Sequence, residues 1–119
     1  MPKKTMVLIL GELVKGNLSN ITREMLGGSR ELADKANGRL ALLLLGDKLE
    51  LVAEEAIAYG ADDVYLAENP QLGTYQADTY SQIIEKAVKD MKPEILLMGQ
   101  TSIGRDLAPR LALDRKSVV

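Results

Sequence analysis

The chain has 119 residues, of which 46% are hydrophobic, so it can build one compact core but is too short for two ordinary domains. Its formal net charge of -2 arises from basic and acidic residues spread along the sequence, which argues against a nucleic-acid partner. The sequence contains no cysteine and no histidine, which excludes disulfides, thiolate nucleophiles, cysteine-type metal sites and the usual general base.

The apolar runs are short. The two longest, residues 6–10 and 40–45, are far below the ~20 residues that cross a bilayer. Lys3 and Lys4 precede an apolar stretch that is too short for a secretory signal. We therefore expect an intracellular, cytoplasmic protein without membrane insertion.

The first predicted elements are a strand and a helix. Residues 5–10 form a continuous, partly β-branched apolar run, which is typical of a strand buried on both faces. Apolar residues then recur at spacings of three and four from residue 18 to 36, which predicts a helix. Ser19 or Asn20 can serve as its N-cap, and Asn37-Gly38 can end it.

Two adjacent glycines, Gly27 and Gly28, fall inside this predicted helix. Each should cost roughly 0.5 to 1 kcal/mol relative to alanine. We therefore expect another backbone to approach the helix closely at this point.

A second strand and helix follow. Residues 40–45 would also suit a helix by composition, but the shortness of the run between two glycines favours a strand. Asp47 and Glu50 have the spacing of a capping box, and Gly60 stands where a left-handed C-cap belongs. A helix is therefore predicted between Asp47 and Gly60.

The second half of the chain continues the alternation. Residues 62–67 are predicted as a strand, residues 68–76 as a loop, and residues 80–91 as a helix that Pro93 ends. A fourth strand is expected at residues 94–98.

The last predicted elements are a turn at residues 99–104, a short helix to about Leu113, and the beginning of a strand at residues 117–119. Strands and helices thus alternate at close spacing, with the crossovers that parallel strands need. We expect a single α/β domain with an open, Rossmann-like parallel sheet and helices on both faces.

In such a sheet, ligands bind beyond the carboxyl ends of the strands. The loop at residues 11–16 has neither the dinucleotide-binding nor the P-loop glycine spacing, so we interpret it as a connection. Asp47 is explained by helix capping. Tyr75 and Tyr80 could stack on a planar ligand, although core packing is the stronger interpretation for Tyr80.

The loop after the fourth predicted strand carries the most chemistry, because it combines two glycines, two hydroxyls and a guanidinium at the start of a helix. It supplies the candidate residues for nucleotide binding or partner contact, which are Gly99, Thr101, Ser102, Gly104 and Arg105.

Two residues refine this loop. Pro109 is tolerated in a first helical turn or at a kink, which predicts that regular helix begins late and leaves the amides of residues 101–106 free. Asp106, however, already brings negative charge to the helix start and can pair with Arg110. Structural capping and a nucleotide site therefore both remain open, with capping favoured.

No catalytic group stands out. The scattered glutamates fall on the polar sides of predicted helices, and Ser102 has no histidine or Ser-x-x-Lys partner to activate it. We predict a protein that is not an enzyme by itself and holds no metal.

Residues 93–112 read PEILLMGQTSIGRDLAPRLA and closely resemble one segment of electron-transfer flavoprotein alpha subunits. Looser agreement, in register, extends upstream to Glu12 and to residues 31–33, 61–65 and 75–80. The Gly-Arg-Asp-Leu-x-Pro-Arg run favours the alpha over the beta subunit. Residues 114–117 depart from the family pattern, which leaves the entry to a fifth strand in doubt.

The resemblance implies an adenine-nucleotide-hydrolase-like N-terminal domain, spanning residues 1–119, of a protein that forms an alpha-beta heterodimer. Such heterodimers carry electrons from flavin dehydrogenases to an acceptor. The family holds its FAD mainly in a C-terminal domain that would lie beyond Val119, and no flavin-binding residue of the family maps onto this sequence. The resemblance therefore implies a scaffold that contacts a beta subunit and binds no cofactor alone.

One competing hypothesis is a stand-alone adenine-nucleotide-binding regulator that resembles universal stress proteins. Gly99 and Gly104 motivate it, because those proteins bind ATP near the corresponding strand. The further Gly-Ser run that they carry downstream is missing here.

Overall fold

The main sheet has four parallel strands in the order β5-β4-β1-β6. The structure is a computed structural model that describes residues 5–112. The strands of the main sheet are β1 (Met6–Leu10), β4 (Arg39–Gly46), β5 (Asp63–Glu68) and β6 (Ile95–Leu97). The helices are α1 (Asn20–Lys35), α2 (Glu50–Ala58), α3 (Ala77–Met91) and α4 (Ser102–Ala112), with a 3-10 turn, η1 (Pro70–Gly73), before α3.

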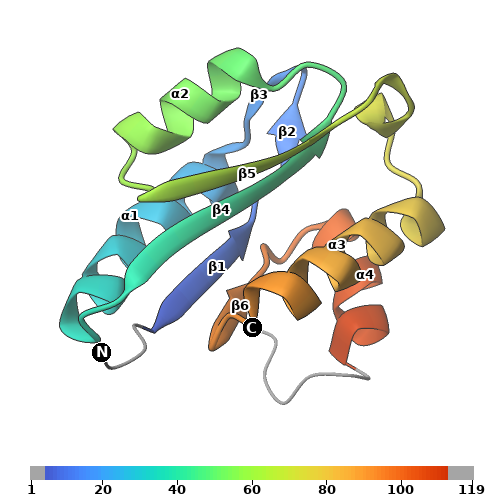
Figure 1. The fold of residues 1–119 in the computed structure, drawn as a ribbon. Helices are drawn as coiled ribbons and strands as arrows, with labels where there is room; N and C mark the ends of the chain where they lie inside the picture. The colour runs from blue at the N-terminus through green and yellow to red at the C-terminus, as the bar shows by residue number, and fades with distance from the viewer. Residues whose placement is uncertain (1–4, 113–119) are drawn as a thin grey trace.

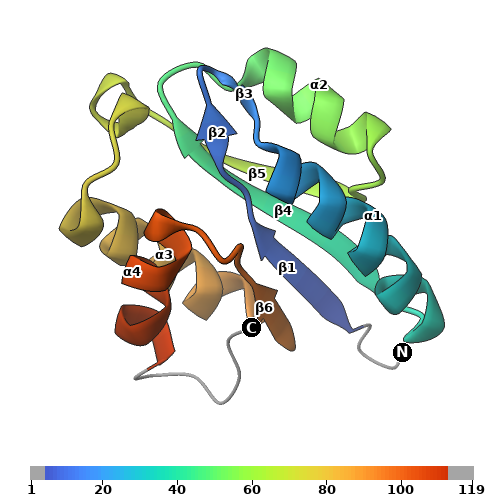
Figure 2. The same ribbon diagram turned by 180° about the vertical axis from the view of Figure 1, so that it is seen from behind.

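Helices cover both faces of this sheet. Figures 1 and 2 show α1 and α2 on one face and α3 and α4 on the other. Alternate residues of the central strands separate accordingly: Val7 and Leu42 pack on the side of α1 and α2, while Leu8 and Leu43 pack on the side of α3 and α4. The predicted open, Rossmann-like parallel sheet is confirmed.

The central strands are buried on both faces, which explains their unbroken apolar sequences. Val7 pairs with Leu40 of β4 and with Ile95 of β6, so β1 lies in the middle of the sheet. Two crossovers lead from β1 to β4 and from β4 to β5 on one side of β1, and a third leads from β5 to β6 on its other side. The strand predictions were right to within one or two residues at each end, whereas the strand predicted at residues 117–119 lies outside the described residues.

The segment after β1 is more ordered than the connecting loop predicted for it. Two short strands, β2 (Leu13–Val14) and β3 (Asn17–Leu18), form an antiparallel hairpin. Its turn residues, Lys15 and Gly16, have φ of 52° and 80°, and positive φ at both positions is the geometry of a type I′ hairpin turn.

The ends of α1 agree with the sequence. Ser19 is the N-cap, and its hydroxyl accepts a hydrogen bond from the amide of Thr22 at 3.2 Å. Asn37 takes the left-handed conformation after the helix, with φ of 52°. Among the residues described, no helix has the length and apolarity needed to cross a membrane.

The expectation of a close backbone approach at Gly27 and Gly28 was wrong. Both glycines are exposed, and a Cβ added at either would meet no atom within 4 Å.

Replacing either glycine by alanine should therefore raise the free energy of unfolding by roughly 0.5 to 1 kcal/mol, because alanine loses less backbone entropy in a helix. Urea unfolding of both variants checks this, and a loss of stability would contradict the open surroundings of these two positions.

The capping box predicted for Asp47 and Glu50 was also wrong. Helix α2 starts two residues later than such a box requires, with Leu49 as its N-cap and no side-chain cap. The carboxylate of Glu68, at the end of β5, accepts the hydrogen bond of the Leu49 amide at 2.8 Å instead. Glu68, which is distant in sequence, thus accepts a hydrogen bond at the start of α2 in place of Asp47, which is exposed.

Candidate functional site

The candidate site lies where the order of the strands changes direction. From β1 the chain proceeds to β4 and β5 on one side, and it then crosses to β6 on the other side of β1. The following helices, α1 and α4, lie on opposite faces of the sheet. Such a switch point opens a crevice at the carboxyl ends of the two strands, where open α/β sheets bind ligands.

Glu12, just after β1, borders this crevice, and its backbone is held by the first turn of α1. Its amide donates to the hydroxyl of Thr22 at 3.0 Å, and its carbonyl accepts from the amide of Ser19 at 2.9 Å. The two hydroxyls of Ser19 and Thr22 lie 2.8 Å apart and are buried. The polar groups of this turn are therefore paired, and Glu12 is fixed in place.

The side chain of Glu12 reaches across the crevice to the start of α4. The hydroxyl of Thr101 donates to Glu12 Oε2 at 2.6 Å and accepts from the amide of Gly104 at 3.0 Å. Thr101 is thus the N-cap of α4 and the donor to a carboxylate at the same time. A negative charge of the chain itself occupies the position where an N-terminal helix dipole would attract an anion.

The late helix start predicted from Pro109 was wrong. Helix α4 begins at Ser102, and the amide of Arg105 already donates to the Thr101 carbonyl at 2.8 Å. Pro109 therefore lies within the helix. The cap at Thr101 fixes the start, and the burial of Leu111 in the core stabilises the turn around the proline. The end predicted near Leu113 lies outside the described residues.

The two glycines of the candidate set serve packing. A Cβ at Gly104 would lie 2.0 Å from the carbonyl oxygen of Gly99, so backbone meets backbone there. A Cβ at Gly99 would lie 3.3 Å from two side-chain carbons of Ile21 on α1, a tight contact. These glycines let the turn fold against α1.

The other three candidate residues lie in two different places. Thr101 joins the two glycines at the crevice, whereas Ser102 and Arg105 are exposed on the outside of α4. Arg105 forms no ion pair with any residue in the range 5–112. Asp106 Oδ1 lies 4.0 Å from Arg110 Nε, so the ion pair predicted from their spacing of four residues is present.

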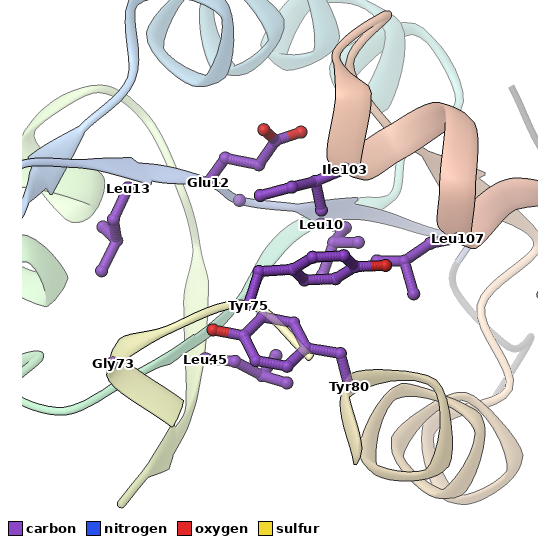
Figure 3. A pocket seen from close by; sticks show the side chains of 10 residues that line it. Leu10, Glu12, Leu13, Leu45, Gly73, Tyr75, Tyr80, Ile103 and Leu107 are labelled. Atoms are coloured by element: carbon purple, nitrogen blue, oxygen red, sulfur yellow. The ribbon is translucent and has the colours of Figure 1, made fainter. Parts of the chain in front are cut away.

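Beside Glu12 lies a small cavity of about 90 Å³. Figure 3 shows the rings of Tyr75 and Tyr80 in it, beneath Ile103 and Leu107 of α4. The two rings meet edge to face, with centroids 4.9 Å apart. This cavity is much smaller than the roughly 300 to 1,000 Å³ of usual ligand pockets, and both rings line it.

A shallower hollow of about 310 Å³ adjoins this cavity over the end of β4. It shares Leu13, Leu45, Gly73 and Tyr80 with the cavity and adds Asp47 and Lys48. Both charged residues are exposed. Their opposite signs at adjacent positions give the hollow no preference for an anion.

Tyr75 ties the loop before α3 to α4, because its hydroxyl donates to Asp106 Oδ2 at 2.6 Å. Burial, and then this hydrogen bond, raise the pKa of Tyr75 to about 12. The ordinary pKa of tyrosine is about 10, so the folded state holds this proton more tightly than the unfolded state. The resulting stability is fully present below about pH 10 and is lost as the pH rises through about 12.

A Tyr75→Phe variant should therefore lose less stability than the parent between about pH 10 and pH 12. Urea unfolding of both proteins at several pH values in this window measures the difference. Parallel pH profiles would show that Tyr75 ionises equally in the folded and unfolded chains.

Sequence reasoning missed two features of the site. It treated Glu12 as part of a connection, although a carboxylate two residues after β1 stands at the carboxyl edge of the sheet, where ligands bind, and this position was the available signal. It also left Tyr75 and Asp106 as separate residues. Nothing local in the sequence indicates that pair, because 31 positions separate them.

Comparison with known proteins identifies relatives along nearly the whole chain. Residues 7–114 match the family model described as the electron transfer flavoprotein domain. The electron transfer flavoprotein subunit alpha of Thermoanaerobacterium thermosaccharolyticum is 42% identical over 106 residues, covering 89% of this chain and 32% of that protein. The subunit alpha of Bacillus subtilis is 39% identical with the same coverage. The chain therefore spans about a third of the length of these relatives.

Related electron-transfer subunits and solved structures extend the comparison. The LctC subunit of the lactate dehydrogenase (NAD(+),ferredoxin) of Acetobacterium woodii is 33% identical over 99 residues, covering 83% of this chain and 24% of that protein. Among solved structures, a universal stress protein in complex with cAMP superimposes with a TM-score of 0.61 at 16% identity, covering 98% of this chain and 94% of that one. Another, from Archaeoglobus fulgidus, has a TM-score of 0.59 at 12% identity, covering 97% and 91%. At these identities the likeness shows the fold alone.

Proposed function

This chain belongs to the electron transfer flavoprotein family, and from that premise we propose that it acts as the N-terminal scaffold domain of an alpha subunit. In this role the domain carries no redox group of its own and presents a surface to a beta subunit. The complete heterodimer passes electrons from flavin dehydrogenases to a further acceptor in the cytoplasm. The match over residues 7–114 to a family of electron carriers is the observation that carries this proposal.

The cavity beside Glu12 does not fit FAD, and the shallow hollow adjoining it carries Asp47 beside Lys48, which gives it no preference for a phosphate. Ligand pockets usually have roughly 300 to 1,000 Å³, whereas the cavity beside Glu12 has about 90 Å³. The Glu12 carboxylate would also repel the pyrophosphate of FAD at the start of α4. We therefore assign the flavin to another part of the alpha subunit and derive no electron-transfer step within this domain.

The alternative function is a nucleotide-binding regulator, in line with the cAMP complex named among the structural neighbours. Glu12 and the packing of Gly104 against Gly99 argue against it, because charge and backbone occupy the place of a phosphate. Titration calorimetry with ATP, AMP and cAMP should give no binding heat, and thermal unfolding should show no shift. A saturable heat with any of the three would favour the regulator.

The scaffold proposal is tested by co-expressing the full-length alpha subunit with the beta subunit encoded beside it. Size-exclusion chromatography should yield a stoichiometric complex with flavin absorbance. A second preparation, in which residues 1–119 are deleted from the alpha subunit, should keep flavin absorbance while losing the beta subunit. A full-length pair that elutes separately and colourless would overturn the proposal, as would a deleted subunit that still binds the beta subunit.

A further inference from the structure

Strand β5 is an edge of the sheet, and no described strand pairs with its outer side (Figure 1). Its four central residues, 64–67, are apolar, and Tyr65 and Leu66 expose 38% and 44% of their surface. Natural edge strands are usually blunted by a proline, a lysine, a bulge or shortness. None of these interrupts β5, whereas β6, at the opposite edge, has three residues.

The acidic residues at the two ends of β5 do not protect this edge, because both serve the fold. Asp63 pairs with Arg39 on β4, at 2.7 Å between Oδ2 and Nε. Glu68 accepts the amide of Leu49 before α2. The ends of β5 are thereby anchored to the sheet, and its outer backbone groups remain available for pairing.

An apolar groove of about 420 Å³ runs between β5 and α3. Apolar atoms line it, mainly from Leu43, Tyr65, Ala67, Ile83, Ala87 and Met91. The groove adjoins the same strand whose edge is unpaired. A strand added beside β5 would place alternate side chains over this groove, because successive side chains of a strand point to opposite faces.

Two opposite charges mark the helical wall of the groove. Lys86 and Asp90 line it one helical turn apart, and they form no ion pair with each other or with another described residue. Four helical residues rise about 6 Å. Two residues of an extended strand span about 6.6 Å, so an acid and a base at alternate positions of an added strand would match both charges.

From this combination we infer that the outer edge of β5 is a docking site for an extended strand of another polypeptide, seated by apolar side chains in the groove and by an acid and a base at alternate positions. Backbone pairing supplies affinity in this mode, and the side chains over the groove supply selectivity. The inference goes beyond the proposed function and does not depend on it.

A second copy of the chain is a poor occupant. Antiparallel pairing of two β5 strands about a two-fold axis would place Asp63 opposite Glu68 twice, and like charges directly opposite each other are unfavourable. The strand also contains no base to meet Asp90. Charge complementarity therefore points to a different protein.

The test uses isotope-labelled protein and two synthetic peptides of about eight residues, a usual strand length, with alternating valine and isoleucine. One carries Glu-x-Lys at its centre and the other Lys-x-Glu. Nuclear magnetic resonance should locate binding at the amides of residues 63–68, with slower hydrogen exchange there, and one peptide should bind more tightly. The charge-reversed variant Lys86→Glu/Asp90→Lys should invert this preference, by roughly threefold to tenfold for two exposed pairs.

A matched control exists on the same helix. The double substitution Glu85→Lys/Lys89→Glu also exchanges charges one turn apart without changing the net charge, but neither residue lines the groove. It should leave the peptide preference unchanged. Failure of both peptides to bind, binding away from residues 63–68, or a preference that follows the control instead of Lys86 and Asp90 would overturn the inference.

Discussion

Replacing Gly104 by alanine should lower the free energy of unfolding by about 3 kcal/mol, the upper range for overpacking a rigid site. The added Cβ would lie 2.0 Å from the Gly99 carbonyl oxygen and 3.3 Å from the Thr101 hydroxyl. A backbone oxygen cannot swing aside as the end of a side chain can. The turn must therefore open, which disturbs the cap of α4 and its contact with Glu12.

Gly28→Ala is the matched control, because it makes the same chemical change in another helix where no atom lies within 4 Å of the new Cβ. The two variants should change stability in opposite directions in urea unfolding. If Gly104→Ala proved as stable as the parent, the close approach of residues 99 and 104 would be refuted. The structural role of this glycine, as opposed to a ligand role, would then lose its support.

The fold could be predicted from the sequence because its strongest signals are local. The unbroken apolar runs at residues 6–10 and 40–45 are buried on both faces, as a central parallel strand requires. The Ser19 cap and the left-handed Asn37 also depend only on neighbours in sequence. These local signals are sufficient to place four strands and four helices.

The candidate loop could be located from the sequence, and capping was its favoured interpretation, but the partner of its threonine could not be predicted. Its loop, residues 99–104, was correctly placed at the carboxyl edge of the sheet. The contacts that the sequence did not predict join distant residues: Thr101 meets Glu12 across 89 positions, and Glu68 replaces Asp47 at the start of α2. Propensity likewise excluded Pro109 from a helix interior, but tertiary packing of the neighbouring leucines overrides that preference.

Glu12 connects the two helices that flank the switch point. Its backbone completes the first turn of α1 and its side chain completes the first turn of α4, so one residue joins the two helices that flank the crevice. A domain with this geometry keeps the open parallel sheet and fills the crevice at its switch point with its own carboxylate. That arrangement suits a scaffold, because a rigid crevice gives the surrounding surfaces a fixed relation.

Substitution of Thr101 tests most directly whether Glu12 joins the two helices. Thr101→Val keeps the shape of the side chain and removes the hydroxyl, so the Gly104 amide loses its cap and the Glu12 carboxylate loses its donor. A lost cap costs about 1 kcal/mol and a hydrogen bond to a charged group about 1.5 to 3 kcal/mol, which together predict a loss of about 2.5 to 4 kcal/mol. Thr101→Ser keeps both hydrogen bonds and should remain within about 1 kcal/mol of the parent.

A double-mutant cycle with Glu12→Ala separates the two contributions, because the carboxylate term disappears from that background while the cap remains. Thr101→Val should then cost only about 1 kcal/mol, the value of the cap alone. Urea unfolding of the four proteins gives the coupling energy. If Thr101→Val cost the same in both backgrounds, Glu12 and Thr101 would not interact energetically, and the closed crevice would have to be explained by the packing of Gly99 and Gly104 alone.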